Sequence, residues 1–252
     1  MNSYNEGDFM LTHYPYQTLG HADHGWLKST HHFSFAHYYN PARMGFGKLR
    51  VINDDWVAAG TGFPAHPHSN MEIISIIRSG AMTHQDSTGN KGVTEAGEVQ
   101  VMSAGTGIVH SEYNRSSEPL TFYQIWLETN KNNIAPRWES KKFPAQPNAA
   151  LTLLASGYDE DKDTALYVNQ QVRIFGGQLS QGTVIEHIIR DQAYILASAG
   201  TFHVATKAYT SAKTQKEKVT LQKGDGLEVT RCNMIELKAS TLCELIIIDV
   251  VA

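Results

Sequence analysis

The chain has 252 residues, of which 41% are hydrophobic and 18% charged, so it can bury the core of one large or two small domains. Its formal net charge of -4 excludes the basic character typical of proteins that bind nucleic acid directly. The first residues lack the pattern of a secretory signal, and the longest apolar runs are too short to cross a bilayer. These features predict a cytoplasmic protein with no membrane or nucleic-acid partner. Cys232 and Cys243 lack metal-site spacing and are expected to be unpaired.

Residues 20–41 are unusually rich in histidine and aromatic side chains. The alternation of His31, Phe33 and Phe35 predicts an extended segment that packs on one side. Such a segment could form the wall of a binding pocket. It could also be a wrapping strand whose histidines make ordinary hydrogen bonds, and the residue pattern alone favours this second interpretation.

From residue 49 onward the pattern is that of short β-strands. Residues 72–86 predict two strands joined near Ser79-Gly80, and residues 120–127 predict another that is dense in aromatic and β-branched side chains. Short strands separated by glycine-rich turns are typical of a sandwich or barrel. The sequence therefore predicts an all-β fold.

Residues 130–150 carry three prolines among lysine, asparagine and serine, and they show no sustained apolar period. This composition predicts a connection between two domains, with the boundary between residues 135 and 136. The β pattern resumes at residue 151, and residues 207–218 predict an exposed, lysine-rich loop. The turn at residues 221–227 is placed much like residues 95–99, which gives weak support to an internal duplication.

Two short segments carry paired metal-binding side chains, His66 with His68 and His110 with Glu112. Residues i and i+2 of a strand point to the same face, so each pair projects together if both segments are strands. Two such strands facing across a barrel would direct three imidazoles and one carboxylate to one point. The sequence therefore predicts a mononuclear metal site with nitrogen and oxygen donors. Four protein ligands leave one or two positions open on a five- or six-coordinate metal, which favours catalysis over a closed structural site.

Other titratable residues are assigned to supporting or solvent positions. Glu72 shares a strand face with His68, but Glu112 already supplies a carboxylate, so a supporting or core-edge role is favoured for Glu72. Asp86 and Glu98 are expected at strand ends in solvent. Six histidines before residue 40 lie outside both pairs and are not assigned to the metal, namely His13, His21, His24, His31, His32 and His37.

The glycine and histidine spacing around the two pairs resembles the two cupin motifs, and four stretches resemble the pirin family specifically. These stretches are residues 22–26, 33–41, 44–53 and 102–114. The resemblance is dense over residues 20–128 and loose beyond them. It implies a bicupin, which is a pair of jelly-roll β-barrels, with a metal-binding domain at residues 1–135 and a degenerate cupin without metal at residues 136–252.

The resemblance also implies the ligands and the activity. The family's ligands fall on His66, His68, His110 and Glu112, and the metal is usually iron, so iron(II) is expected, with manganese, cobalt, nickel, copper and zinc as alternatives. Pirin-like proteins are associated with quercetin 2,3-dioxygenase activity and, in animals, with nuclear co-regulation of transcription. The implied function is cleavage of a flavonol such as quercetin by O2, with Glu112 as the catalytic base. The alternative is a regulatory protein whose metal state governs a protein partner without essential catalysis.

One feature departs from the family pattern. Members often carry Arg-Asp after the His-Pro-His segment, whereas this chain has Ser69-Asn70. Two charges near the predicted site are absent, so the electrostatics of the pocket are expected to differ from those of better-studied members. The natural substrate is left open by this difference.

Overall fold

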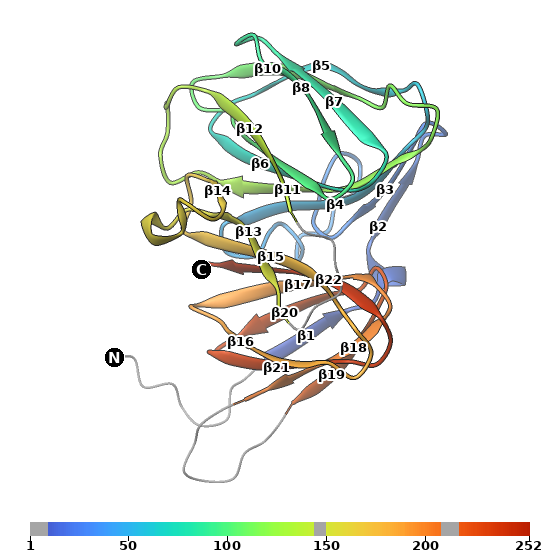
Figure 1. Cartoon of the computed structure of the whole chain (residues 1–252), viewed down its shortest axis with the longest axis vertical. Helices are drawn as coiled ribbons and strands as arrows, with labels where there is room; N and C mark the ends of the chain where they lie inside the picture. Colours follow the sequence, from blue (N-terminus) through green and yellow to red (C-terminus); the bar gives the residue numbers. More distant parts are fainter. Residues whose placement is uncertain (1–9, 144–149, 208–216) are drawn as a thin grey trace. The chain divides into compact units, whose positions relative to one another are not determined.

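The computed structural model describes residues 10–143, 150–207 and 217–252 (Figure 1). Within these residues the chain forms twenty-two β-strands, two short 3-10 helices, η1 (Tyr16–Thr18) and η2 (Asp159–Asp161), and no α-helix. The strands divide between two compact units. The all-β prediction is therefore confirmed. No helix in the described parts of the chain is long and apolar enough to span a membrane.

The first unit consists of the described residues of Leu19–Pro144 and Leu154–Gln171. Its strands form a seven-stranded sheet in the order β12-β9-β6-β11-β4-β3-β2 and a four-stranded sheet in the order β5-β10-β7-β8. The bounds of these strands are β2 (Gly20–Asp23), β3 (Leu27–His31), β4 (Leu49–Val57), β5 (Gly62–His68), β6 (Met71–Ser79), β7 (Ala81–Asp86), β8 (Lys91–Glu95), β9 (Glu98–Ser103), β10 (Ile108–Tyr113), β11 (Leu120–Glu128) and β12 (Arg137–Lys142).

The second unit consists of the described residues of Met1–Thr18, Ala145–Leu153 and Val172–Ala252. It contains neighbouring strands in the order β1-β20-β17-β22-β15 and a four-stranded sheet in the order β16-β21-β18-β19. A short parallel pair, β13 with β14, precedes β15 in the chain and lies mostly in residues 154–171 of the first unit. The bounds of the remaining strands are β1 (Met10–Tyr14), β13 (Thr152–Ser156), β14 (Leu166–Tyr167), β15 (Val172–Leu179), β16 (Val184–Ile188), β17 (Gln192–Ala199), β18 (Thr201–Thr206), β19 (Lys218–Gln222), β20 (Gly226–Thr230), β21 (Met234–Ala239) and β22 (Cys243–Val250).

The two units repeat one strand order. In the order of neighbouring strands within the sheets, β5-β10-β7-β8 corresponds to β16-β21-β18-β19, and β9-β6-β11-β4 corresponds to β20-β17-β22-β15. This repetition supports the internal duplication that the turn at residues 221–227 indicated only weakly. Cys232 and Cys243 are both buried and unpaired in the second unit.

Neither unit is one continuous segment, so a single boundary at residue 135 does not describe them. β1 pairs with β20 of the second unit over five residue pairs, while residues 154–171 belong to the first unit. The stretch expected to connect two domains contains β12, which pairs with β9 as an edge strand. Its side chains are mostly exposed, so no apolar alternation marks it as a strand. Residues 144–149 of that stretch and 208–216 of the expected lysine-rich loop lie outside the described residues.

The large sheet of the first unit alternates between apolar and polar positions. Ile52 and Ile125 are fully buried on one face, and Asn53 and Gln124 occupy the next positions along β4 and β11, on the opposite face. Asn53 and Gln124 are themselves buried, at 2% and 9% exposed. Buried polar side chains need hydrogen-bonding partners, so the interior of this unit holds a polar site as well as a core.

Gly62 allows β5 to approach β10 closely. A Cβ at this position would overlap the carbonyl oxygen of Glu112 and lie 2.5 Å from Cα of Tyr113. We expect Gly62→Ala to force the two strands apart and to lower the free energy of unfolding by about 1–3 kcal/mol, the usual cost of overpacking. Urea unfolding of the variant and the wild type measures this difference in free energy. Gly177→Ala is the matched control, because the nearest atom to its Cβ is 3.4 Å away; equal losses in the two variants would contradict the prediction.

Candidate metal centre

Three of the predicted ligands converge where β5 and β10 pair. In this antiparallel pair His110 lies opposite His66, and Ile108 lies opposite His68. The ring centroids of His66 and His110 are 4.4 Å apart, and those of His68 and His110 are 5.0 Å apart. One ring nitrogen from each of the three histidines lies within 4.8 Å of the others. This spacing suits three ligands around one ion.

Glu112 lies in an adjoining cluster. The register of β10 against β5 shifts between His110 and Glu112, and Glu112 stands opposite His84 of β7. Its carboxylate groups with His84 and His110, with all three ligand atoms within 4.8 Å of one another. Within the described residues the two clusters overlap at His110. The four-ligand set therefore stays a prediction, with three histidines already together and the carboxylate beside them.

Two amide side chains hold the Glu112 carboxylate. Nε2 of Gln100 donates to Oε1 at 2.9 Å, and Nε2 of Gln124 donates to Oε2 at 2.8 Å. Glu112 is only 2% exposed, and this burial raises its pKa to about 7 although the two amides act in the opposite direction. Both the ionised and the neutral forms of Glu112 are thus accessible near neutral pH.

The tautomer of His66 and the pKa values of His68 and His110 suit metal binding. Nδ1 of His66 lies 2.7 Å from the carbonyl oxygen of Pro64, so the proton sits on Nδ1 and Nε2 keeps a free lone pair. Burial, with the neighbouring histidines adding to it, lowers the pKa of His68 to about 4 and that of His110 to about 2, which keeps both neutral.

His110 provides the direct test of whether a metal fits. The residue is 2% exposed, and neither of its ring nitrogens has a hydrogen-bond partner. A buried polar atom without a partner costs roughly 1–3 kcal/mol, so such atoms usually have a role. A transition ion bound by the three histidines would give His110 the missing partner. The residues present therefore fit a metal centre.

A cavity of about 620 Å³ opens beside the histidines. His66, His68 and Glu112 line it together with aromatic side chains, including Phe35 and Trp126. This volume lies within the range of pockets for small organic ligands.

Residues 20–41 contribute to the cavity wall, so the pocket-wall interpretation describes the segment better than the wrapping strand. His31, Phe35 and Tyr38 line the cavity. Trp26, in the same segment, does not line the cavity and packs edge to face with Phe63, with ring centroids 5.3 Å apart. Phe33 is fully buried in the core.

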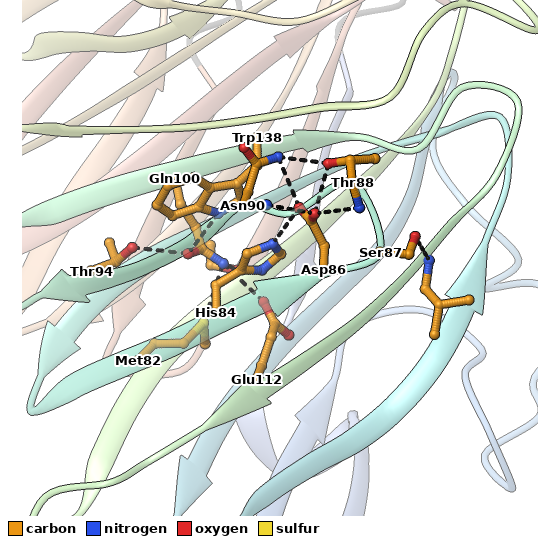
Figure 2. Close-up of polar contacts among 12 residues, drawn as sticks. Met82, His84, Asp86, Ser87, Thr88, Asn90, Thr94, Gln100, Glu112 and Trp138 are labelled. Carbon is orange, nitrogen blue, oxygen red and sulfur yellow. Dashed lines mark hydrogen bonds and ion pairs between the residues drawn. The ribbon is translucent and has the colours of Figure 1, made fainter.

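Asp86 does not lie in solvent, contrary to the sequence prediction. Its side chain is 0% exposed and accepts hydrogen bonds from His84, Thr88 and Asn90 (Figure 2). The sequence Asp-Ser-Thr-Gly-Asn has the composition of an exposed turn, but here the turn folds back over the carboxylate. Glu98 begins β9 as expected but is half-buried, and it accepts a hydrogen bond from the backbone N–H of Glu95.

Glu72 takes a supporting role outside both clusters. It is 1% exposed and accepts a hydrogen bond from the Ser103 hydroxyl at 2.7 Å. The backbone N–H of Asn169 donates to it at 3.1 Å. Glu72 therefore ties β6 to the returning segment at residues 154–171 and is not placed as a ligand.

Ser69-Asn70 forms the turn between β5 and β6. Asn70 has a φ of +48°, a left-handed conformation that asparagine tolerates better than most residues. Its side-chain oxygen accepts from the backbone N–H of Asn133 at 2.8 Å. Neither Ser69 nor Asn70 lines the cavity, so the departure from the family pattern acts on the turn and not on the cavity wall.

His84 is the site residue that the sequence reasoning missed. It lies on β7, is fully buried and belongs to the cluster with His110 and Glu112. The available signal was the His84-x-Asp86 spacing, which places both side chains on one face of a strand just as in the two nominated pairs.

The chain matches known families and relatives along most of its length. Residues 13–127 match the Pirin family model, and residues 153–250 match that of the quercetinase C-terminal cupin domain. A pirin-like protein from Caulobacter vibrioides is 44% identical over 243 residues, covering 95% of this chain and 99% of the relative. A quercetin 2,3-dioxygenase from Escherichia coli (strain K12) is 52% identical over 157 residues, covering 62% of this chain and 66% of that protein.

A solved structure agrees with these matches. The bacterial pirin YhhW from Escherichia coli in complex with nickel(II) superposes with a TM-score of 0.85 and 38% sequence identity, covering 96% of this chain and 99% of that one. The two-barrel architecture expected from the cupin motifs is thus shared over nearly the whole chain. The chain belongs to the pirin family, and its two units have the bicupin fold.

Proposed function

We propose that this protein is a metal-dependent dioxygenase that cleaves a flavonol such as quercetin. The metal would be held by His66, His68 and His110, with Glu112 completing the set, and iron(II) is the expected ion. The observation that carries the proposal is the partnerless, buried His110 within a histidine cluster beside the cavity. The Escherichia coli relative named quercetin 2,3-dioxygenase and the nickel(II) in a related pirin support it.

The cavity suits a planar aromatic substrate. Phe35, Phe63 and Trp126 contribute ring surface to its wall. Phe35 meets Trp126 edge to face with ring centroids 5.5 Å apart, and His68 meets Trp126 in the same way at 4.8 Å. Such walls favour aromatic rings over flexible chains, since edge and face contacts need flat partners. A flavonol has flat fused rings and a hydroxyl beside a ketone, which can face the metal ligands.

Glu112 would accept the proton of the substrate hydroxyl. Its pKa of about 7 matches the requirement for a base that works near neutral pH. Gln100 and Gln124 fix the carboxylate from both sides, so its orientation is set before the substrate arrives. The bound metal would supply Lewis acidity that lowers the pKa of that hydroxyl. In the overall reaction both atoms of O2 enter the ring-opened product, and one ring carbon leaves as carbon monoxide.

The test pairs metal analysis with oxygen uptake. Protein purified without added metal is expected to contain close to one transition ion per chain and to consume O2 with quercetin. His66→Ala should lose both properties, and His203→Ala, in the second unit, should keep both. Bound metal without O2 uptake on flavonols would favour the regulatory alternative. Failure to bind a metal after reconstitution would overturn the metal site and the dioxygenase together.

A further inference from the structure

We propose that His84 is a positioning residue that orients His110 for metal binding by accepting a hydrogen bond from the ring nitrogen of His110 remote from the metal. The inference rests on the proposed metal site and adds the residues that orient one of its ligands without binding the metal.

The His84 ring is fixed in place before any metal binds. It is fully buried and stacks on the Trp138 ring, with centroids 5.0 Å apart and an angle of 9° between the planes. Its Nε2 lies 3.0 Å from Oδ2 of Asp86. Trp138 in turn donates its indole N–H to Oε1 of Gln100 at 3.2 Å, as Figure 2 shows. A stacked, hydrogen-bonded ring has little freedom to rotate.

Asp86 determines which nitrogen of His84 carries the proton. Its Oδ1 accepts the backbone N–H and hydroxyl of Thr88 at 2.9 and 2.7 Å, and the backbone N–H of Asn90 at 3.1 Å. Its Oδ2 accepts the side-chain amide of Asn90 at 3.0 Å. Both oxygens of Asp86 thus accept hydrogen bonds from donors of its own turn, so the carboxylate meets His84 as an acceptor. Nε2 of His84 must therefore donate to it, which leaves Nδ1 with a lone pair.

The unsatisfied atoms of this cluster complement one another. In the described residues six buried side-chain polar atoms lack a partner, and three of them are Nδ1 of His84 and the two ring nitrogens of His110. The ring centroids of His84 and His110 are 5.4 Å apart. Glu112, the third member of the cluster, already accepts an amide on each oxygen. When one nitrogen of His110 binds a metal, the other carries a proton, and Nδ1 of His84 is the acceptor beside it. One metal and one hydrogen bond satisfy all three atoms.

This arrangement links a surface turn to the metal. Thr88 and Asn90 of the turn donate hydrogen bonds to Asp86, and Asp86 accepts one from His84. His84 then sets the tautomer and the ring angle of His110. Histidines that bind metals usually have such a partner on the other ring nitrogen, and losing it typically weakens metal affinity by about 10–100-fold.

The experiment measures nickel(II) affinity by chelator competition and the visible absorption of the cobalt(II)-loaded protein. In His84→Phe, which keeps the stacked ring but has no acceptor, we expect about 10–100-fold weaker nickel binding and an altered cobalt spectrum. His84→Asn, which can present an oxygen near the Nδ1 position, should recover part of the affinity. His187→Phe is the matched control, because His187 is also a buried strand histidine with a partnerless nitrogen but lies in the second unit. It should bind nickel(II) like the wild type.

The outcomes separate the two proposals. Wild-type affinity and an unchanged cobalt spectrum in His84→Phe would overturn the role of His84 and leave the metal site intact. Absence of nickel and cobalt binding in the wild type would overturn both. If urea unfolding shows that His84→Phe does not fold, His84→Met replaces it, because methionine is apolar and adapts to irregular spaces. The same affinity loss is expected there, and wild-type affinity would overturn the inference.

Discussion

Adding nickel(II) to metal-free protein is expected to raise its unfolding temperature by on the order of 10 °C, and His110→Ala should abolish this increase. A ligand that binds only the folded state at 1,000 times its dissociation constant stabilises that state by about 4 kcal/mol, and each kcal/mol moves the midpoint by roughly 2–4 °C at this size. His110 is common to both clusters of ligand atoms, so its removal leaves neither complete. Differential scanning calorimetry with and without metal measures the effect.

Two controls test whether the increase in unfolding temperature is specific to nickel(II) at the histidine cluster. Magnesium should not produce the shift, because it prefers six oxygen ligands and the cluster offers imidazole nitrogens. His187→Ala removes a buried histidine of the second unit and should retain the response to nickel(II). A shift of equal size in His110→Ala and the wild type would show that nickel(II) stabilises the protein from another place.

Replacing Glu112 by glutamine is expected to lower kcat on quercetin by about 100- to 10,000-fold, the usual contribution of a general base. Glutamine keeps the shape of the side chain but has no carboxylate to take a proton. Because the three histidines form their own cluster, Glu112→Gln should retain metal, with weaker affinity. Oxygen uptake must therefore be compared at equal metal occupancy.

The matched variant is Glu72→Gln. Glu72 is also a buried carboxyl of the first unit whose pKa burial raises, but its partners are Ser103 and Asn169. It should turn over quercetin at close to the wild-type rate per bound metal. Unimpaired turnover by Glu112→Gln would remove the general base from the mechanism while leaving the metal ligands in place.

Local patterns predicted the strands that matter most for the site. The two strands at residues 72–86 and their joint near Gly80 are present as β6 and β7. The i, i+2 spacing placed His66 with His68, and pairing of β5 with β10 brought His110 to them. What local pattern could not supply is pairing between distant residues. The edge strand β12 is polar and exposed, and β1 finds its partner more than two hundred residues away.

The spacing of the predicted ligands did not indicate two features around the site, the place of His84 beside Glu112 and the burial of Asp86. The register of β10 against β5 shifts between His110 and Glu112, and Glu112 stands opposite His84 in the pairing of β10 with β7. Such a shift leaves no mark in the spacing of side-chain types. The prediction that Asp86 lies in solvent was wrong because a run of turn residues predicts exposure in every case. The composition is the same whether the turn points outward or closes over its own carboxylate.

The discontinuous make-up of the two units constrains how the chain can fold while it is synthesised. Domains commonly fold one after another as they leave the ribosome, beginning at the N-terminus. Here the first unit lacks Asn169, the partner of Glu72, until residues 154–171 have emerged. β1 is made more than two hundred residues before its partner β20. A nascent chain stopped at residue 135 would therefore expose an unpaired β1 and an unfinished first barrel, a form that chaperones would need to protect.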